Sequence, residues 1–117
     1  MPETRYYRDS SERLTFEMFR IPAEDYAVLC KAVVAAFSLT PDWTSFGAGL
    51  DQVFLDVRRG EHVVELAWDI WSGFTVVAKT TDSESLVREI ADWSLDFIQR
   101  SRNQQVVHDE DAADPLR

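Results

Sequence analysis

Three carboxylic acids, Asp56, Glu65 and Asp69, lie close together in the middle of the chain. Paired carboxylates carry out general acid–base chemistry when their environments differ, which usually requires a cleft. The alternating sequence around these residues instead predicts a flat, open sheet face on which Lys79 lies opposite Glu65. We therefore predict no catalytic residue here, and we interpret the three carboxylates as candidate contacts for a binding partner.

Two tryptophans complete the candidate partner-binding set. Trp71 falls at the rim of the same predicted face, and Trp43 falls in the segment PDWTSFGAG at residues 41–49. Tryptophan is enriched among the residues that dominate protein interfaces. The candidate partner-binding residues are therefore Asp56, Glu65, Asp69, Trp71 and Trp43. Two plainer interpretations stay open: a solvated sheet face, and a loop that folds back so that Trp43 covers the edge of the core.

The chain offers little for metal, cofactor or nucleophilic chemistry. It has two histidines, His62 and His108, and one cysteine, Cys30, with neither an HExxH nor a Cys-x-x-Cys motif. A structural zinc site needs several such ligands. Cys30 falls on the apolar stripe of a predicted helix, a position typical of a packed core residue. We therefore predict no metal site, no cofactor and no enzymatic activity.

The acidic composition restricts the class of partner. The chain carries 12 Lys and Arg against 21 Asp and Glu, which gives a net charge of −9. This balance argues against nucleic-acid binding, because affinity for phosphates comes largely from Lys and Arg. The acidic excess would suit a basic protein partner, since opposite charges steer association. Solubility alone is the plainer explanation.

The apolar periodicity predicts the order of the elements. A strand over residues 14–21 is followed by a helix over 22–37 and a long loop over 38–50. A three-stranded meander then covers residues 51–79, and a second helix covers 82–100. The order β-α-β-β-β-α predicts an α+β fold, in which an antiparallel sheet has two helices packed on one face.

Two turns fix the expected register of the meander. Residues 59–60 would form a two-residue turn, and residues 71–73 a three-residue turn. These turns place Leu66 opposite Val53 on one side and opposite Ala78 on the other. Both hairpins then agree on one apolar face. The expected face comprises Leu55, Val64, Leu66, Trp68, Ile70, Phe74 and Val76.

The length of 117 residues suits a single domain. We expect a flexible N-terminal segment over residues 1–12, one α+β domain over 13–101 and an acidic disordered tail over 102–117. The N-terminus lacks the apolar region of a signal peptide, and no apolar run approaches the roughly 20 residues that span a bilayer. These features predict a cytoplasmic protein that does not enter membranes.

Residues 64–93 carry a Trp-x-x-Trp-x-Gly-Phe hairpin, formed by Trp68, Trp71, Gly73 and Phe74, ahead of a terminal amphipathic helix. In this stretch the chain resembles small bacterial α+β proteins of the toxin-immunity type. The resemblance implies a protein that binds and neutralises a partner protein.

These observations lead to two main expectations. The first is a small acidic protein-interaction module, in its sharpest form an immunity-type inhibitor that occludes a basic partner. The alternative is a small-ligand-binding domain or accessory subunit, with an aromatic pocket between the 39–50 loop and the sheet that includes Trp43 and Phe46. Formation of a homodimer through the open sheet face is a third.

Overall fold

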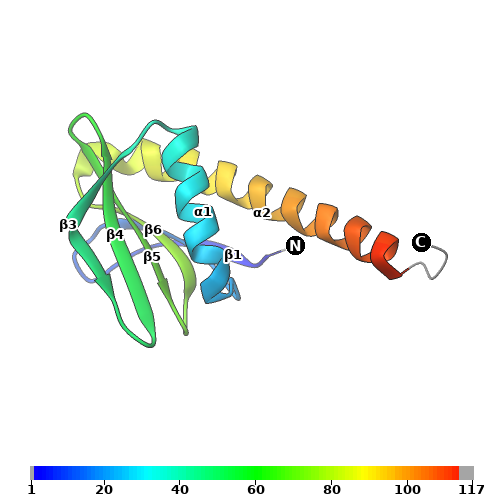
Figure 1. Cartoon of the computed structure of the whole chain (residues 1–117). Coiled ribbons are helices and arrows are strands. Elements are labelled where there is room, and N and C mark those ends of the chain that lie inside the picture. The colour runs from blue at the N-terminus through cyan, green and yellow to red at the C-terminus, as the bar shows by residue number, and fades with distance from the viewer. Residues whose placement is uncertain (1, 114–117) are drawn as a thin grey trace.

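The computed structural model describes residues 2–113, with side chains described as far as residue 103. A six-stranded antiparallel sheet has the strand order β1-β2-β6-β5-β4-β3, with two helices beside it (Figure 1). The elements in chain order are β1 (Thr4–Arg8), β2 (Leu14–Met18), α1 (Ala23–Ala36), β3 (Thr40–Ala48), β4 (Gln52–Arg59), β5 (His62–Asp69), β6 (Gly73–Ala78), a 3-10 turn η1 (Thr81–Ser83) and α2 (Glu84–Ala113). The predicted α+β class is confirmed.

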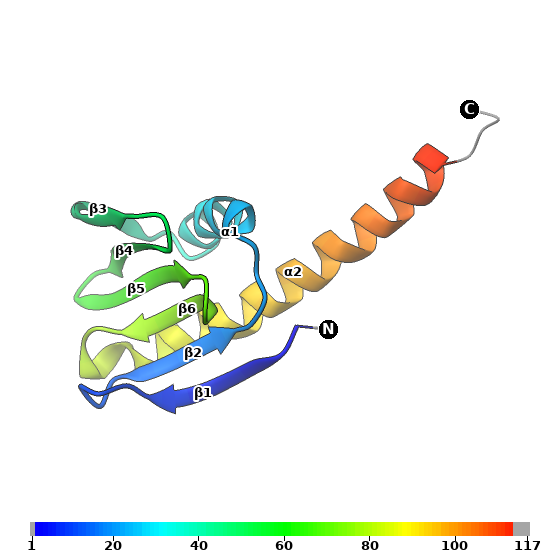
Figure 2. The ribbon, with the colours of Figure 1, turned by 90° about the horizontal axis from the view of Figure 1, so that it is seen from below.

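Both helices pack on the same face of the sheet, as predicted. Leu29 of α1, Ile90 of α2 and Leu66 of β5 belong to one hydrophobic core. Opposed residues of neighbouring strands share a face, so Leu66 forms a continuous layer with Leu55 and Val76. α2 covers β2 and β6, whereas α1 lies over β5, and Figure 2 shows α2 projecting well beyond the sheet.

The meander is present, but each hairpin is shifted by two residues from the predicted register. Leu66 pairs with Leu55 and Val76, and not with Val53 and Ala78. The first loop begins at Gly60 with φ +64°, the position at which type II′ turns favour glycine. A shift of two residues keeps every side chain on its face. The predicted apolar face is therefore correct apart from Ile70, which lies in the second loop and is 52% exposed.

Two strands were missed by the sequence analysis. β1 occupies part of the N-terminal segment predicted to be flexible, and it pairs with β2 along its whole length. β3 occupies the predicted 38–50 loop, where Pro41 and Gly47 argued against a strand. Both are edge strands, and an edge position tolerates proline because one side of the strand needs no ladder hydrogen bonds.

The last helix is longer than predicted. α2 continues to Ala113, so residues 102–113 of the expected disordered tail are helical, and residues 114–117 lie outside the described residues. The sequence contains no glycine or proline between Gly73 and Pro115, which removes the usual signals for ending a helix. Within the described part of the chain, no helix is long and apolar enough to cross a membrane.

Candidate functional site

Asp56 and Glu65 lie directly opposite each other on β4 and β5. Both project from the sheet face opposite the helices, because their strand neighbours face the core. The Lys79 ammonium bridges them, with Nζ 3.4 Å from Asp56 Oδ1 and 3.6 Å from Glu65 Oε2. The expected contact between Glu65 and Lys79 is present, although Val77 is the residue directly opposite Glu65. The acidic pair is thus partly neutralised within the chain.

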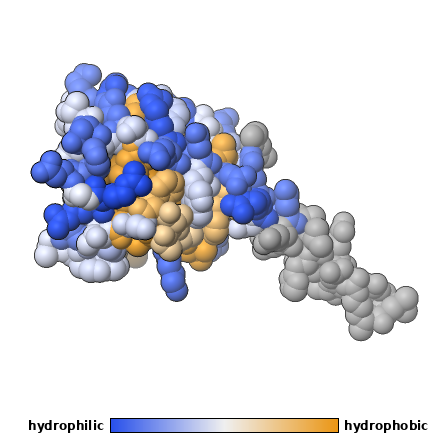
Figure 3. Space-filling model, turned by 90° about the horizontal axis from the view of Figure 1, so that it is seen from above, coloured by the Kyte–Doolittle hydropathy of each residue, from blue (hydrophilic) through white to orange (hydrophobic). Residues whose placement is uncertain are grey.

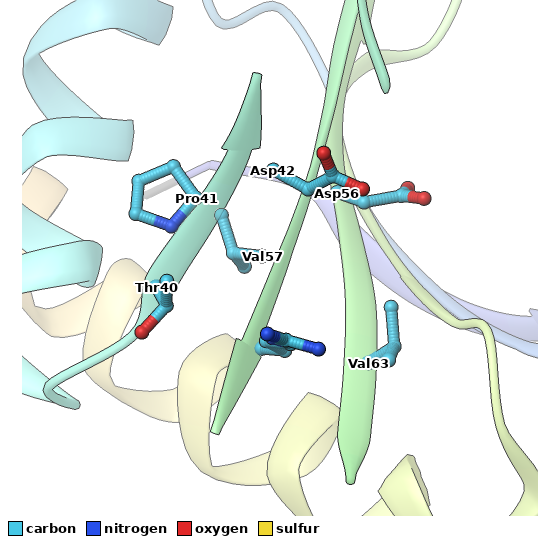
Figure 4. Close-up of a pocket in the computed structure, with 7 residues that line it drawn as sticks. Thr40, Pro41, Asp42, Asp56, Val57 and Val63 are labelled. Carbon is cyan, nitrogen blue, oxygen red and sulfur yellow. The ribbon is translucent and has the colours of Figure 1, made fainter. Parts of the chain in front are cut away.

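A shallow hollow of about 300 Å³ lies beside this acidic pair. Asp42 of β3 is directly opposite Asp56 there, and Figure 4 shows the two side chains next to each other. Hydrogen bonds from the hydroxyl and amide of Thr44 hold the pKa of Asp42 below its ordinary value, helped by the nearby Arg58 charge. The carboxylates of the hollow therefore interact mainly with groups of their own chain. Its lining comprises Thr40, Pro41, Asp42, Asp56, Val57, Arg58 and Val63.

Asp69 stabilises the turn between β5 and β6. Its Oδ1 atom accepts hydrogen bonds from the amide of Trp71 at 2.9 Å and from the amide of Ser72 at 2.6 Å. This turn presents the Trp71 side chain, which is 74% exposed. The Asp69 carboxylate therefore positions the tryptophan.

Two exposed apolar residues accompany Trp71, and the sequence analysis did not select them as site residues. Leu50 in the β3–β4 turn is 99% exposed, and Ile70 is 52% exposed. The two turns adjoin, because the Ile70 amide donates to the Asp51 carbonyl at 3.1 Å. We call Leu50, Ile70 and Trp71 the turn cluster. Their signal in the sequence is an apolar residue at a turn position, where polar residues dominate.

Trp43 lies apart from the acidic pair, on the helix side of the sheet. It contacts a space between α1 and β3, together with Tyr26 of α1 and Leu55 of β4. Asp42, its neighbour in the chain, faces the opposite side with Asp56. The structure therefore divides the five candidate residues among three places: the acidic pair, the β5–β6 turn and the space around Trp43.

An apolar groove of about 370 Å³ opens between α1 and β3. The rings of Trp43 and Phe46 lie 6.0 Å apart and form one wall, with 68% and 47% of their surfaces exposed. An aromatic pocket between the 39–50 segment and the sheet was the alternative expectation; in the structure most of its second wall comes from α1, and Leu55 is the contribution of β4. We call it the α1–β3 groove. Its lining comprises Tyr26, Ala27, Cys30, Lys31, Val34, Pro41, Trp43, Phe46 and Leu55.

A bulge in β3 directs both aromatic rings into this groove. The register with β4 shifts between Asp42 and Gly47, so residues 43–46 stand outside the regular ladder. The Ser45 hydroxyl accepts a hydrogen bond from the Asp56 amide at 2.8 Å, and Asp42 Oδ1 accepts one from the Thr44 amide at 3.1 Å. Bulges re-aim side chains and often occur beside functional sites. These bonds fix the aromatic wall.

Tyr26 and Cys30 form the floor of the groove. The Tyr26 hydroxyl donates to the Leu66 carbonyl at 2.6 Å, which fixes α1 over β5. Burial raises the pKa of the Cys30 thiol to about 12, and burial also raises the pKa of the Tyr26 hydroxyl. Both groups stay neutral near pH 7, so the floor of the groove is uncharged.

Large hydrophobic side chains are exposed both in the groove and elsewhere on the surface. Figure 3 shows hydrophobic residues gathered in the middle of the face seen from above, with hydrophilic residues around them. The large apolar side chains that are exposed are Tyr6, Val28, Trp43, Phe46, Leu50, Ile70 and Trp71.

Neither a protein-family model, nor a curated protein, nor a solved structure matches this chain.

Proposed function

We propose that this protein is an interaction module that binds another protein through the turn cluster. The observation that supports this most is the exposure of Leu50, Ile70 and Trp71 on two adjoining turns. Contiguous exposed apolar surface on a folded domain often marks an interaction site. Tryptophan is also among the residue types most often found to dominate binding.

The turn cluster is held in place before any partner binds. Asp69 fixes the amides of Trp71 and Ser72, and the Gly49 amide donates to the Gln52 carbonyl at 2.7 Å across the neighbouring turn. A partner would therefore order few backbone dihedrals on binding, and the entropy cost of association falls accordingly. Rigid presentation of Trp71 favours a specific partner over indiscriminate apolar adhesion.

The charge of the chain indicates the chemistry of that partner. The net charge is −9, and the exposed Asp51 lies in the turn beside Leu50. An apolar pocket surrounded by Lys and Arg would complement both features. An inhibitor of the toxin-immunity type would act in this way, by occluding a basic surface of its target. The acidic pair is a weaker candidate contact, because Lys79 already bridges it.

Affinity capture with matched variants tests the proposal. Immobilised wild type, Trp71→Ala, Leu50→Ser and Trp43→Ala are exposed to lysate of the native organism at low and high salt, and bound proteins are quantified by mass spectrometry. We expect a basic protein that wild type and Trp43→Ala retain, that both turn variants lose, and that high salt weakens. With the purified partner, calorimetry should show Kd raised about tenfold or more by Trp71→Ala.

Trp43→Ala is the matched control, since it removes a tryptophan of similar exposure from another surface. Thermal melting of each variant confirms that the fold is retained. Retention of every captured protein by Trp71→Ala would contradict the proposal. Light scattering at high protein concentration separates a partner from self-association, because a turn cluster that dimerises would give twice the monomer mass.

A further inference from the structure

The α1–β3 groove lies outside the turn cluster, and its lining is chemically distinctive. Tyr26, Cys30, Trp43 and Phe46 supply neutral or aromatic surface, and Lys31 is the charged residue among those that line it. Lys31 takes part in none of the ion pairs among residues 2–103. The apolar lining of the α1–β3 groove, with Lys31 as its cation, complements a ligand that has an apolar body and one negative charge.

The groove is suited to a small molecule by size and stiffness. Its volume of about 370 Å³ falls in the range of small-ligand pockets, roughly 300–1,000 Å³. Its aromatic wall is fixed by the β3 bulge, through the hydrogen bonds of Asp42 and Ser45. Its opposite wall is fixed by the bond between Tyr26 and Leu66. A ligand would enter a site that is already formed.

The same bulge disfavours an extended peptide as the occupant. A peptide that adds a strand to a sheet needs a regular edge for its main-chain hydrogen bonds. The register of β3 is interrupted between Asp42 and Gly47. The Thr44 amide in that interval is already bonded to the Asp42 carboxylate. An added strand would therefore lose hydrogen bonds at the centre of the edge.

We infer that the α1–β3 groove binds a small apolar monocarboxylate, with its body against Trp43 and Phe46 and its carboxylate at Lys31. This inference is independent of the turn-cluster proposal. The body of the ligand is either an aliphatic chain or an aromatic ring system, since both fit an apolar wall of aromatic side chains.

Isothermal titration of the purified protein with decanoate, decanol and decylammonium tests the inference. We expect decanoate to bind one to one and at least about threefold more tightly than either analogue, as one partly exposed ion pair allows. The net charge of −9 attracts cations and repels anions at long range, so by itself it would favour decylammonium over decanoate. A preference for the anion must then come from a local cation. Parallel titration with indole-3-acetate distinguishes an aromatic body from an aliphatic one.

Three variants locate the site. Lys31→Met should abolish the preference for decanoate over decanol. Trp43→Ala should weaken decanoate about tenfold or more, because it removes half of the aromatic wall. Trp71→Ala, the matched exposed tryptophan in the turn cluster, should bind like wild type.

Several results would overturn the inference. Equal or tighter binding of decylammonium would contradict recognition of the carboxylate by Lys31. Wild-type affinity for decanoate in Trp43→Ala would show that the ligand does not bind in the groove. If neither decanoate nor indole-3-acetate binds, the inference is wrong as a whole. Dimerisation that decanoate suppresses and Trp43→Ala abolishes would make a second copy of the chain the occupant instead. None of these results depends on Trp71, so the turn-cluster proposal is judged separately.

Discussion

The two edges of the sheet are constructed in opposite ways. The β1 edge is tied to α2 by charge and aromatic contacts: Arg8 pairs with Glu84, and the Arg88 guanidinium lies 5.0 Å from the centre of the Tyr6 ring. The same Tyr6 ring packs 5.3 Å from Phe16 of β2. These contacts tie the edge to α2 and cover part of the Tyr6 ring, which remains 40% exposed.

The β3 edge, in contrast, is shaped by its own bulge and leaves aromatic rings exposed. The centres of the Trp43 and Phe46 rings lie 6.0 Å apart, and the α1–β3 groove separates these rings from α1. The difference follows from the position of the helices, because α2 lies over β2 and β6 while α1 is anchored over β5 by Tyr26. Where α2 contacts the edge side chains the edge is tied down, and where α1 stops short of β3 an open apolar groove remains.

Among variants at the two edges of the sheet, the largest effect is expected from removing Arg5. Glu17 of β2 is 2% exposed, and its Oε2 accepts a hydrogen bond from Arg5 Nε at 2.6 Å. The Arg5 guanidinium lies 4.7 Å from the Tyr7 ring and 5.4 Å from the Phe19 ring, so it also covers that carboxylate. Arg5→Met should lower the free energy of unfolding by about 2 kcal/mol, measured by urea titration, because a buried carboxylate loses its cation.

The double variant Arg5→Met/Glu17→Gln should recover most of that loss, since it removes the uncompensated charge. Arg58→Met is a matched control: it removes an exposed arginine near the other edge and should change stability by less than about 0.5 kcal/mol. Equal midpoints for Arg5→Met and wild type would show that β1 is held without this ion pair.

A smaller loss is expected from disturbing the bulge of the open edge. A Cβ atom on Gly47 would overlap the Phe54 ring. Gly47→Ala should therefore cost about 1–2 kcal/mol by urea titration, as overpacking does when a side chain can partly move aside. Gly49→Ala is the matched control, because its Cβ would approach nothing closer than 4.0 Å. Replacing Phe54 by Leu in the Gly47→Ala background should restore stability, and failure to do so would place the strain in the backbone.

The open edge should also respond to alkali. Burial raises the folded-state pKa of Cys30 to about 12 from an ordinary 9.0, so above pH 9 the unfolded chain releases a proton that the folded chain keeps. Stability should then decrease between pH 9 and 12, with a slope of at most about 1.4 kcal/mol per pH unit for this thiol. Cys30→Ala should reduce the slope between pH 9 and 10, measured by urea titration at each pH.

The β1 edge should respond to acid instead. Hydrogen bonding from Arg8 lowers the pKa of Glu84, so the stability that this pair contributes is present above the unfolded pKa and is lost as the pH falls through the folded one. Arg8→Met should therefore reduce the loss of stability on acidification while leaving the alkaline slope unchanged. An alkaline slope that persists fully in Cys30→Ala would assign it to the tyrosines whose pKa burial also raises, namely Tyr6, Tyr7 and Tyr26.

The buried face of the meander was predicted correctly from local alternation, whereas the strand register and the edge strand β1, which depend on tertiary pairing, were not. Alternation between Val64 and Val76 gave the buried face despite a register error, because a two-residue shift preserves the face. β1 becomes a strand only because Tyr6 and Arg5 find partners on β2 and α2, which no local pattern encodes.

The sequence singled out two tryptophans that prove to be exposed, but it did not predict the geometry around them. Trp43 and Trp71 are exposed as a binding role requires, yet alternation cannot place Trp43 across a bulge that interrupts the ladder. The β3–β4 and β5–β6 turns adjoin only because β4 and β5 are paired in the observed register. Asp69 was selected as a charged contact for a partner, but its carboxylate accepts hydrogen bonds from backbone amides of its own turn.

The smallest effect on stability is expected at the open edge itself. Trp43 is 68% exposed and packs mainly on Phe46, so Trp43→Ala should change the free energy of unfolding by less than about 0.5 kcal/mol. Trp68→Ala provides the contrast, because Trp68 packs against the core and its Nε1 donates to the Ile21 carbonyl at 2.6 Å. That variant should cost about 3 kcal/mol or more. If the two variants unfold at the same urea concentration, Trp43 packs against the fold and stabilises it as much as Trp68 does. If only Trp68→Ala is destabilised, the chain maintains an exposed indole that its fold does not need, which is the property expected of a side chain kept for binding.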